Sequence, residues 1–201
     1  MSSLESLIEK AMQLHSEGHT TSQIADELSL STDTITWLLT RKREGEAPKD
    51  IHIDWTTVAG HSAQLHDIAV MMLRNLYYKL SEEGEGPEPE VVIGVAHSGI
   101  PLATLIAAEA DLMLSTYHPK KHAQGDHPVS SMSSNFSPVA NRQCIIVDDV
   151  ITTGNTVTDL VDFLMKHGAK PVAILVIFDK KGVSSVGGVP VCPLFRVSRI
   201  D

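Results

Sequence analysis

Two adjacent carboxylates stand directly before a hydroxyl-rich turn in the second half of this sequence. The run Cys144–Thr156 reads CIIVDDVITTGNT, so Asp148 and Asp149 follow a short apolar stretch and Gly154 lies in the turn. Such an apolar stretch is typical of a buried strand, and carboxylates at its end can hold sugar hydroxyls or a hydrated Mg²⁺. A turn that leads straight into a helix points backbone N–H groups at one spot, beside the positive end of the helix dipole. These residue types therefore predict a site for a phosphorylated sugar.

This run resembles the phosphoribosyl diphosphate signature of the type I phosphoribosyltransferases. In that signature a hydrophobic strand, two acids and two small apolar residues precede Thr-Thr-Gly-x-Thr, and the match is continuous from Cys144 to Thr156. The resemblance implies that Asp148 and Asp149 hold the ribose 2′- and 3′-hydroxyls and, through water, Mg²⁺. It also implies a cradle for the 5′-phosphate, formed by Thr152, Thr153, Gly154, Asn155 and Thr156.

Two further segments acquire roles from the same resemblance. The run VVIGVAHSGIPLA at 91–103 is again strand, short turn and helix, and it resembles the family's diphosphate loop. The residues implied to bind diphosphate are Ala96, His97, Ser98 and Gly99, with a strained non-proline peptide expected at Ala96–His97. The run YHPKKH at 117–122 stands where the orotate branch carries a mobile catalytic loop. If the chain is an enzyme, Lys120, Lys121 and Asp149 are therefore the catalytic candidates, and a flexible basic loop without a catalytic part is the alternative.

The part of the site that would bind the acceptor base departs from the orotate branch of the family. The chain resembles this branch most closely, from about Ile51 onward. That branch normally begins with a substrate strand rich in Ser, Gly, Pro and Tyr, and IHIDWTTVAG replaces it here at 51–60. The branch also places an arginine after the acid that ends its last parallel strand, whereas Lys180 follows Asp179 here. A lysine supplies charge but not a bidentate fork. The pattern thus favours a sensor of the phosphosugar, with an active orotate phosphoribosyltransferase as the alternative.

Alternating strands and helices must position these segments. After a largely helical stretch at 54–80, apolar patterns predict strands at 91–95, 112–117, 144–148 and 171–178, and helices at 101–110 and 155–167. Continuous apolar strands suit a parallel sheet that helices bury on both faces. We therefore predict an α/β domain, and the resemblance implies the type I phosphoribosyltransferase fold.

The beginning of the chain predicts a small all-α domain. Helical spacing indicates a helix that stops at Gly18, a second capped by Thr21 or Ser22, and a third capped by Ser31 or Thr32. The run TTSQIADELSLSTDTITWLL at 20–39 is a helix-turn-helix pattern, with Ser29 at a turn position often held by glycine. The predicted DNA-binding residues on and after its recognition helix are Thr32, Thr34, Thr36, Trp37, Arg41, Lys42 and Arg43. Mixed charges with Gly and Pro at 41–49 indicate a linker, which gives domains 1–48 and 49–201.

Charge and composition narrow the function further. The formal net charge is -9, and residues 1–50 hold nine acids and five bases, or -4, so a general nucleic-acid coat is excluded. A helical hairpin used only for dimerisation is accordingly the alternative to DNA binding. Two cysteines in apolar runs predict buried, reduced thiols and a cytoplasmic protein. No apolar run approaches the roughly 20 residues that a bilayer span needs, so no membrane partner is predicted.

A helix-turn-helix joined to such a domain resembles the archaeal orotate-phosphoribosyltransferase-like transcriptional regulators of sugar metabolism. The resemblance extends to the Asp54-Trp55 pair and to the SSNF run at 133–136. It implies a homodimer that binds double-stranded DNA and responds to phosphoribosyl diphosphate with Mg²⁺, or to a related sugar phosphate. The genes under control would be those of sugar or nucleotide metabolism.

Overall fold

The chain divides into two compact units. A computed structural model describes residues 4–40, 48–82, 86–123 and 129–198, and its two units are Met1–Thr57 and Val58–Asp201. The division falls after residue 57, whereas the sequence predicted a boundary after residue 48. Asp50 and His52 account for the difference, because both hydrogen-bond to the helical unit, to Ser31 N at 2.7 Å and to Leu28 O at 3.2 Å.

The first unit is all-α, as predicted. Its helices are α1 (Leu4–Ser16), α2 (Thr21–Glu27) and α3 (Thr32–Thr40). They enclose an apolar cluster formed by Ala11, Ile24, Ala25, Leu28, Leu30, Ile35 and Leu38. Packing of an amphipathic face, more than intrinsic propensity, is what stabilises helices as short as these.

Local hydrogen bonds set the ends of these helices. The N-cap of α2 is Thr20, one residue before the predicted caps, because Thr20 and Gln23 form a reciprocal capping box. Ser31 caps α3 as predicted, since its Oγ accepts from Thr34 N at 3.2 Å. Ser29 has φ 52° in the turn between α2 and α3, which explains why this turn position favours glycine.

The second unit contains a mostly parallel sheet in the order β3-β2-β1-β4-β5-β7-β6. The strands are β1 (Val91–Val95), β2 (Met113–His118), β3 (Ser131–Met132), β4 (Gln143–Ile151), β5 (Lys170–Asp179), β6 (Ser185–Val186) and β7 (Val189–Arg196). The five long strands are parallel, and the two short ones pair antiparallel at the edges. This is the predicted α/β fold.

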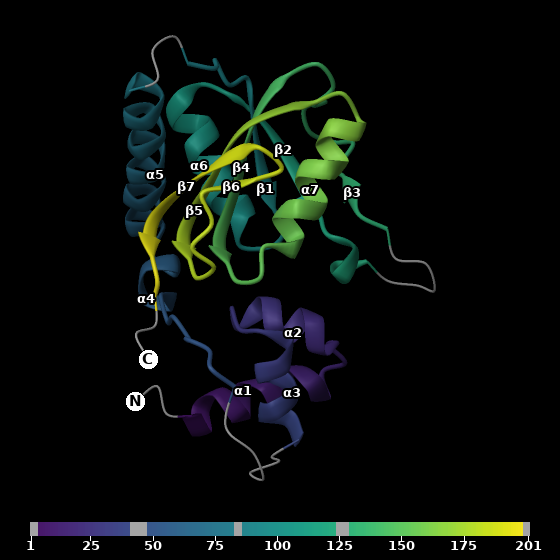
Figure 1. Ribbon diagram of the computed structural model, residues 1–201. Helices are drawn as coiled ribbons and strands as arrows, with labels where there is room; N and C mark the ends of the chain where they lie inside the picture. Colours follow the sequence, from purple (N-terminus) through teal and green to yellow (C-terminus); the bar gives the residue numbers. More distant parts are fainter. Residues whose placement is uncertain (1–3, 41–47, 83–85, 124–128, 199–201) are drawn as a thin grey trace. The chain divides into compact units, whose positions relative to one another are not determined.

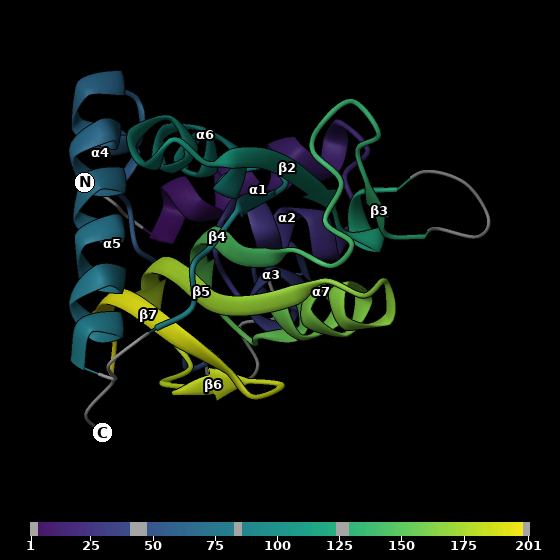
Figure 2. The same ribbon diagram turned by 90° about the horizontal axis from the view of Figure 1, so that it is seen from above.

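Helices cover both faces of this sheet (Figures 1 and 2). The covering helices are α5 (Ser62–Glu82), α6 (Gly99–Ala110) and α7 (Asn155–Lys166). The short helix α4 (Thr56–Ala59) precedes α5, and a 3₁₀ turn, η1, spans Lys120–His122. A Cβ on Gly94 would lie 2.7 Å from Ile100 Cα, so alternate β1 residues face α6, while Ile93 belongs to the cluster that packs against α7. The predicted helical stretch at 54–80 is interrupted between α4 and α5.

Strand β4 extends further than predicted. The sequence predicted its end at Asp148, but pairing with β5 continues through Val150 and Ile151, opposite Phe178 and Asp179. The two acids therefore lie within the last residues of a strand and not after it. Strands β3, β6 and β7 were not predicted. The two-residue strands β3 and β6 leave no alternation of apolar and polar residues to detect, and Pro190 and Pro193 interrupt the apolar run of β7.

Both cysteines are free and buried, as predicted. Burial raises the pKa of the Cys144 thiol to about 11, so this thiol stays protonated at neutral pH. Among the described residues, no helix combines the length and apolar character that crossing a bilayer requires.

Candidate functional site

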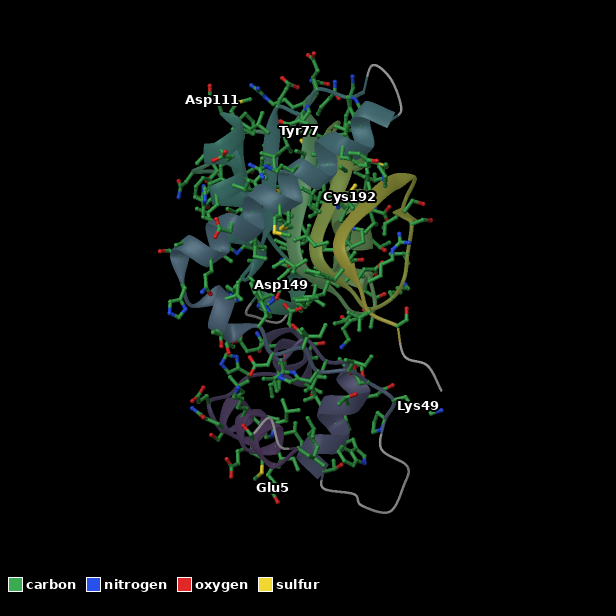
Figure 3. The ribbon with its side chains drawn as sticks, turned by 90° about the vertical axis from the view of Figure 1, so that its left-hand side faces the viewer. Glu5, Lys49, Tyr77, Asp111, Asp149 and Cys192 are labelled. Carbon is green, nitrogen blue, oxygen red and sulfur yellow. The ribbon has the colours of Figure 1, made fainter. Side chains whose placement is uncertain are left out.

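The acid pair lies at the carboxyl end of the parallel sheet. Asp148 and Asp149 are 9% and 7% exposed, and Figure 3 shows Asp149 at the opposite end of the sheet from Asp111, which follows α6. Open α/β sheets bind their ligands at this end. Two carboxylates that are so withdrawn from water require hydrogen-bond donors or a cation, because an unpaired buried charge is costly.

Ser98 joins the turn after β1 to the acid pair. Its hydroxyl donates to Asp149 Oδ1 at 2.7 Å, although Ser98 immediately precedes α6 and would ordinarily cap that helix. The preceding peptide, Ala96–His97, is a cis non-proline bond, at the position where a strained non-proline peptide was expected. Segments 51 residues apart in the sequence thus meet at one end of the sheet.

Gly99 permits this close approach. A Cβ at Gly99 would lie 2.3 Å from the carbonyl oxygen of Val147 in β4, so any side chain would push the start of α6 away from the acid pair. We expect Gly99→Ala to lower the free energy of unfolding by about 1–3 kcal/mol, the usual cost of overpacking, and to weaken ligand binding. Thermal unfolding measures the first effect. Ala108→Ser, which adds one atom to an exposed position of α6, should unfold like the unaltered chain, and equal stability of Gly99→Ala would contradict the tight contact.

The turn between β4 and α7 has the geometry of an anion cradle. Gly154 adopts φ +82° at the N-cap of α7, a conformation that glycine tolerates best. Because glycine has no side chain, it cannot itself bond the first N–H groups of α7, and a bound phosphate is a suitable partner for them. The neighbours predicted for the cradle surround it: Thr153 and Asn155 are exposed, and Thr152 and Thr156 are partly exposed.

The predicted basic segment lies beside this cradle. Lys121 Nζ donates to Thr156 Oγ1 at 2.9 Å, and Lys120 pairs with Asp159 of α7 at 3.3 Å. The ring of His122 stands edge-on to the ring of His97, with 4.5 Å between centroids. The three segments that the sequence singled out therefore converge at one place.

A third lysine at this place was not predicted. Lys181 Nζ donates to the backbone carbonyl of Thr153 at 2.6 Å. No pattern in the sequence indicates this contact, which arises because Ile151 pairs with Asp179 and the turns after β4 and β5 are neighbours. The lysine that the sequence indicated was Lys180, whose backbone N–H donates to Ile151 O at 2.9 Å.

The acid pair fits a hydrated magnesium ion. Mg²⁺ prefers oxygen ligands, keeps several waters, and is usually held by one or two carboxylates together with substrate phosphates. Asp148 and Asp149 supply such carboxylates beside the turn that is predicted to hold a phosphate. Within the described part of the chain, no group of three or more His, Cys, Asp or Glu side chains could form a cage made of protein alone.

Helix α3, the predicted recognition helix, presents only some of the side chains that were predicted to bind DNA. Thr32 and Thr36 are exposed. Thr34, predicted to bind DNA from the edge of the outward face, is only 8% exposed and donates to Asp50 Oδ2 at 2.9 Å, so its hydroxyl is withdrawn from the surface of α3. Trp37 is half-buried against the helical core, and its indole N–H is buried without a hydrogen-bond partner in the described residues. Trp37, which was predicted to bind DNA, therefore presents only part of its side chain at the surface of α3. Arg41, Lys42 and Arg43 lie outside the described residues.

Known proteins are similar to this chain over its whole length, and a family model matches most of the second unit. Residues 61–184 match the family described as the phosphoribosyl transferase domain. The chain is 52% identical over 201 residues to a protein named transcriptional regulator GfcR from Methanospirillum hungatei, with 100% of both chains covered. It is 54% identical over 202 residues to a protein of the same name from Methanocorpusculum labreanum, again with 100% of both covered.

Solved structures of phosphoribosyltransferases resemble most of this chain. Orotate phosphoribosyltransferase from Aeropyrum pernix has a TM-score of 0.54 at 22% identity, covering 77% of this chain and 83% of that one. Adenine phosphoribosyltransferase from Thermoanaerobacter pseudethanolicus has a TM-score of 0.58 at 14% identity, covering 77% and 92%. At such identities the likeness shows the fold alone.

Proposed function

This chain belongs to the family of GfcR transcriptional regulators and has a phosphoribosyl transferase domain, and from this premise we propose that it senses phosphoribosyl diphosphate or a related sugar phosphate. The observation that carries the proposal is the 2.7 Å hydrogen bond from Ser98 to Asp149. It unites the loop at 96–99 with the acid pair at the same end of the sheet as the cradle at 152–156.

The ligand would occupy all three segments. Its 5′-phosphate would accept from the cradle, its ribose hydroxyls would bond to Asp148 and Asp149, and its diphosphate would accept from backbone amides at 96–99. Mg²⁺, held through water by the acid pair, would neutralise the diphosphate. Lys121 now bonds to Thr156, and it would exchange this partner for a phosphate oxygen, a stronger, charge-assisted acceptor.

The helix-turn-helix would bind double-stranded DNA as part of a homodimer. Two recognition helices, presented by a two-fold axis, match two half-sites of an operator. Asp50 lies in the segment that leads to the second unit, and its carboxylate accepts hydrogen bonds from Ser31 and Thr34 at the start of α3. A ligand that moved this segment would therefore also move α3. A ligand can act only by favouring one state of this arrangement over another.

The alternative function is that of a phosphoribosyltransferase acting on orotate or another base. The contact of Lys121 with the cradle favours it, because a cation placed there could also neutralise a departing diphosphate. The replacement of the expected arginine by Lys180 favours a sensor, since the acceptor's carboxylate would lose a bidentate partner.

One experiment on the purified chain separates the two functions. Phosphoribosyl diphosphate with Mg²⁺ is titrated by calorimetry, turnover is assayed with orotate and a panel of other bases, and DNA from beside the chain's own coding region is tested by electrophoretic shift. We expect binding, a ligand-dependent shift, and turnover well below about one per second, the lower end of the usual enzyme range. Turnover at or above that rate would establish the enzyme instead. The absence of any shift at low salt, with or without ligand, would contradict DNA binding.

A further inference from the structure

We propose that Lys181 positions the 5′-phosphate cradle, as the residue that fixes the orientation of the Thr153–Gly154 peptide. This inference rests on the proposed function, since it concerns the same ligand site. It assigns a role to the turn after β5, which is separate in sequence from the acid pair, the cradle and the diphosphate loop.

A buried carboxylate builds the turn that carries Lys181. Asp179, the last residue of β5, has 0% exposure, and its Oδ1 accepts from Lys181 N at 3.0 Å and from Gly182 N at 2.7 Å. Gly182 follows with φ +71°. Since Lys180 N also donates to Ile151 O at 2.9 Å, the turn is fastened both to its own strand and to the end of β4. The backbone of Lys181 is therefore held in place before its side chain makes any contact.

The side chain of Lys181 then reaches the cradle at the peptide that joins Thr153 to Gly154, the residue with positive φ. Lys181 Nζ lies 2.6 Å from Thr153 O and 3.4 Å from where a Cβ of Gly154 would be. Its ammonium carries three donors, and the bond to Thr153 O uses one of them. The ammonium group thus lies at the carbonyl side of the Thr153–Gly154 peptide, at the edge of the cradle.

This contact orients the peptide for phosphate binding. The C=O and N–H of a trans peptide point in opposite directions, so a lysine that holds Thr153 O on one side directs the Gly154 N–H to the other. The cation also stabilises the negative end of the peptide dipole, which strengthens its N–H as a donor to an anion. Lys181 further keeps a carbonyl oxygen from facing the phosphate, where the two would repel each other. The ligand class that gains from this arrangement is a sugar phosphomonoester.

The test measures two partial ligands with the full-length chain. Ribose 5-phosphate probes the cradle, and inorganic diphosphate with Mg²⁺ probes the loop at 96–99. We expect Lys181→Met to weaken ribose 5-phosphate binding about tenfold, the loss of roughly one charge-assisted hydrogen bond, and to change diphosphate binding less than about twofold. Lys181→Arg should restore most of the affinity, because it keeps both charge and donors. Lys170→Met, at the other end of β5, matches the change in net charge and should leave both ligands bound as before.

The outcomes distinguish a failure of the proposed role of Lys181 from a failure of the proposed function. Equal weakening of both ligands by Lys181→Met would mean a general loss of structure and would overturn the positioning role, as would unchanged binding of ribose 5-phosphate. An unaltered chain that binds neither ligand would overturn the proposed function itself, and the role of Lys181 with it. Thermal unfolding of each variant shows whether the fold is intact.

Discussion

The double substitution Asp148→Asn and Asp149→Asn is expected to lower the affinity for phosphoribosyl diphosphate by about a hundredfold or more. Each carboxylate is proposed to accept hydrogen bonds from the ribose and to hold Mg²⁺ through water. A hydrogen bond to a charged group contributes about 1.5–3 kcal/mol, and two such losses correspond to at least two factors of ten. Calorimetric titration with Mg²⁺ present measures the change directly.

The same variant should retain its fold and its DNA binding. Asparagine matches aspartate in shape and removes two adjacent charges that are 9% and 7% exposed, so the sheet should tolerate it. The electrophoretic shift should persist but cease to respond to the ligand. Asp162→Asn, an exposed position of α7, is the matched control and should bind the ligand normally. A double variant that still binds within a few-fold of the unaltered chain would remove the acid pair from the site.

The features that the sequence predicted are those encoded in neighbouring residues. The runs VVIGV and CIIV have no polar face, because helices bury both sides of the parallel sheet, and this made β1 and β4 recognisable. Gly154 follows such a run and precedes a helix, so the turn that requires its positive φ was also predictable. In both cases the controlling interactions lie within a few residues of one another.

The features that could not be predicted from the sequence depend on residues far apart in the chain. Thr34 is 16 residues from Asp50, and nothing in the periodicity of α3 indicates that a later carboxylate withdraws its hydroxyl from the surface. Lys181 is 28 residues from Thr153, and their contact exists only because β4 and β5 end side by side. The spacing of apolar residues predicts helices and strands, but it does not predict which strand ends lie side by side.

The N-cap of α2 lies between these two cases, because it was predictable from the sequence but was not predicted. Thr20, Thr21 and Ser22 are all suitable N-caps for α2, and propensity alone does not choose among them. Gln23 makes the choice, because its side chain returns to Thr20 N at 2.8 Å, and only Thr20 stands three residues before it. The pairing was present in the sequence, and applying the capping-box spacing would have found it.

The second large effect is expected on DNA binding. Thr36 is exposed near the middle of α3, and its hydroxyl bonds only back to Thr32 O at 2.9 Å among the contacts described. Thr36→Glu should preserve the helix, since glutamate is the better helix former, while placing a negative charge in each proposed DNA contact of the dimer. Like charges brought together across an interface cost several kcal/mol, which corresponds to about a hundredfold weaker binding or more. Electrophoretic shift at low salt measures the loss.

A substitution of opposite sign makes this test specific. Asp33→Asn removes an exposed negative charge from the first turn of α3 and should strengthen DNA binding several-fold, since fewer like charges then face the phosphates. Lys10→Gln on α1 changes the net charge by the same amount as Thr36→Glu and should weaken binding far less if α3 is the reading helix. Equal effects of Lys10→Gln and Thr36→Glu would mean that only overall charge matters. If neither substitution on α3 altered binding, the helical unit would be left with dimerisation as its role, because its exposed helix would then face no DNA.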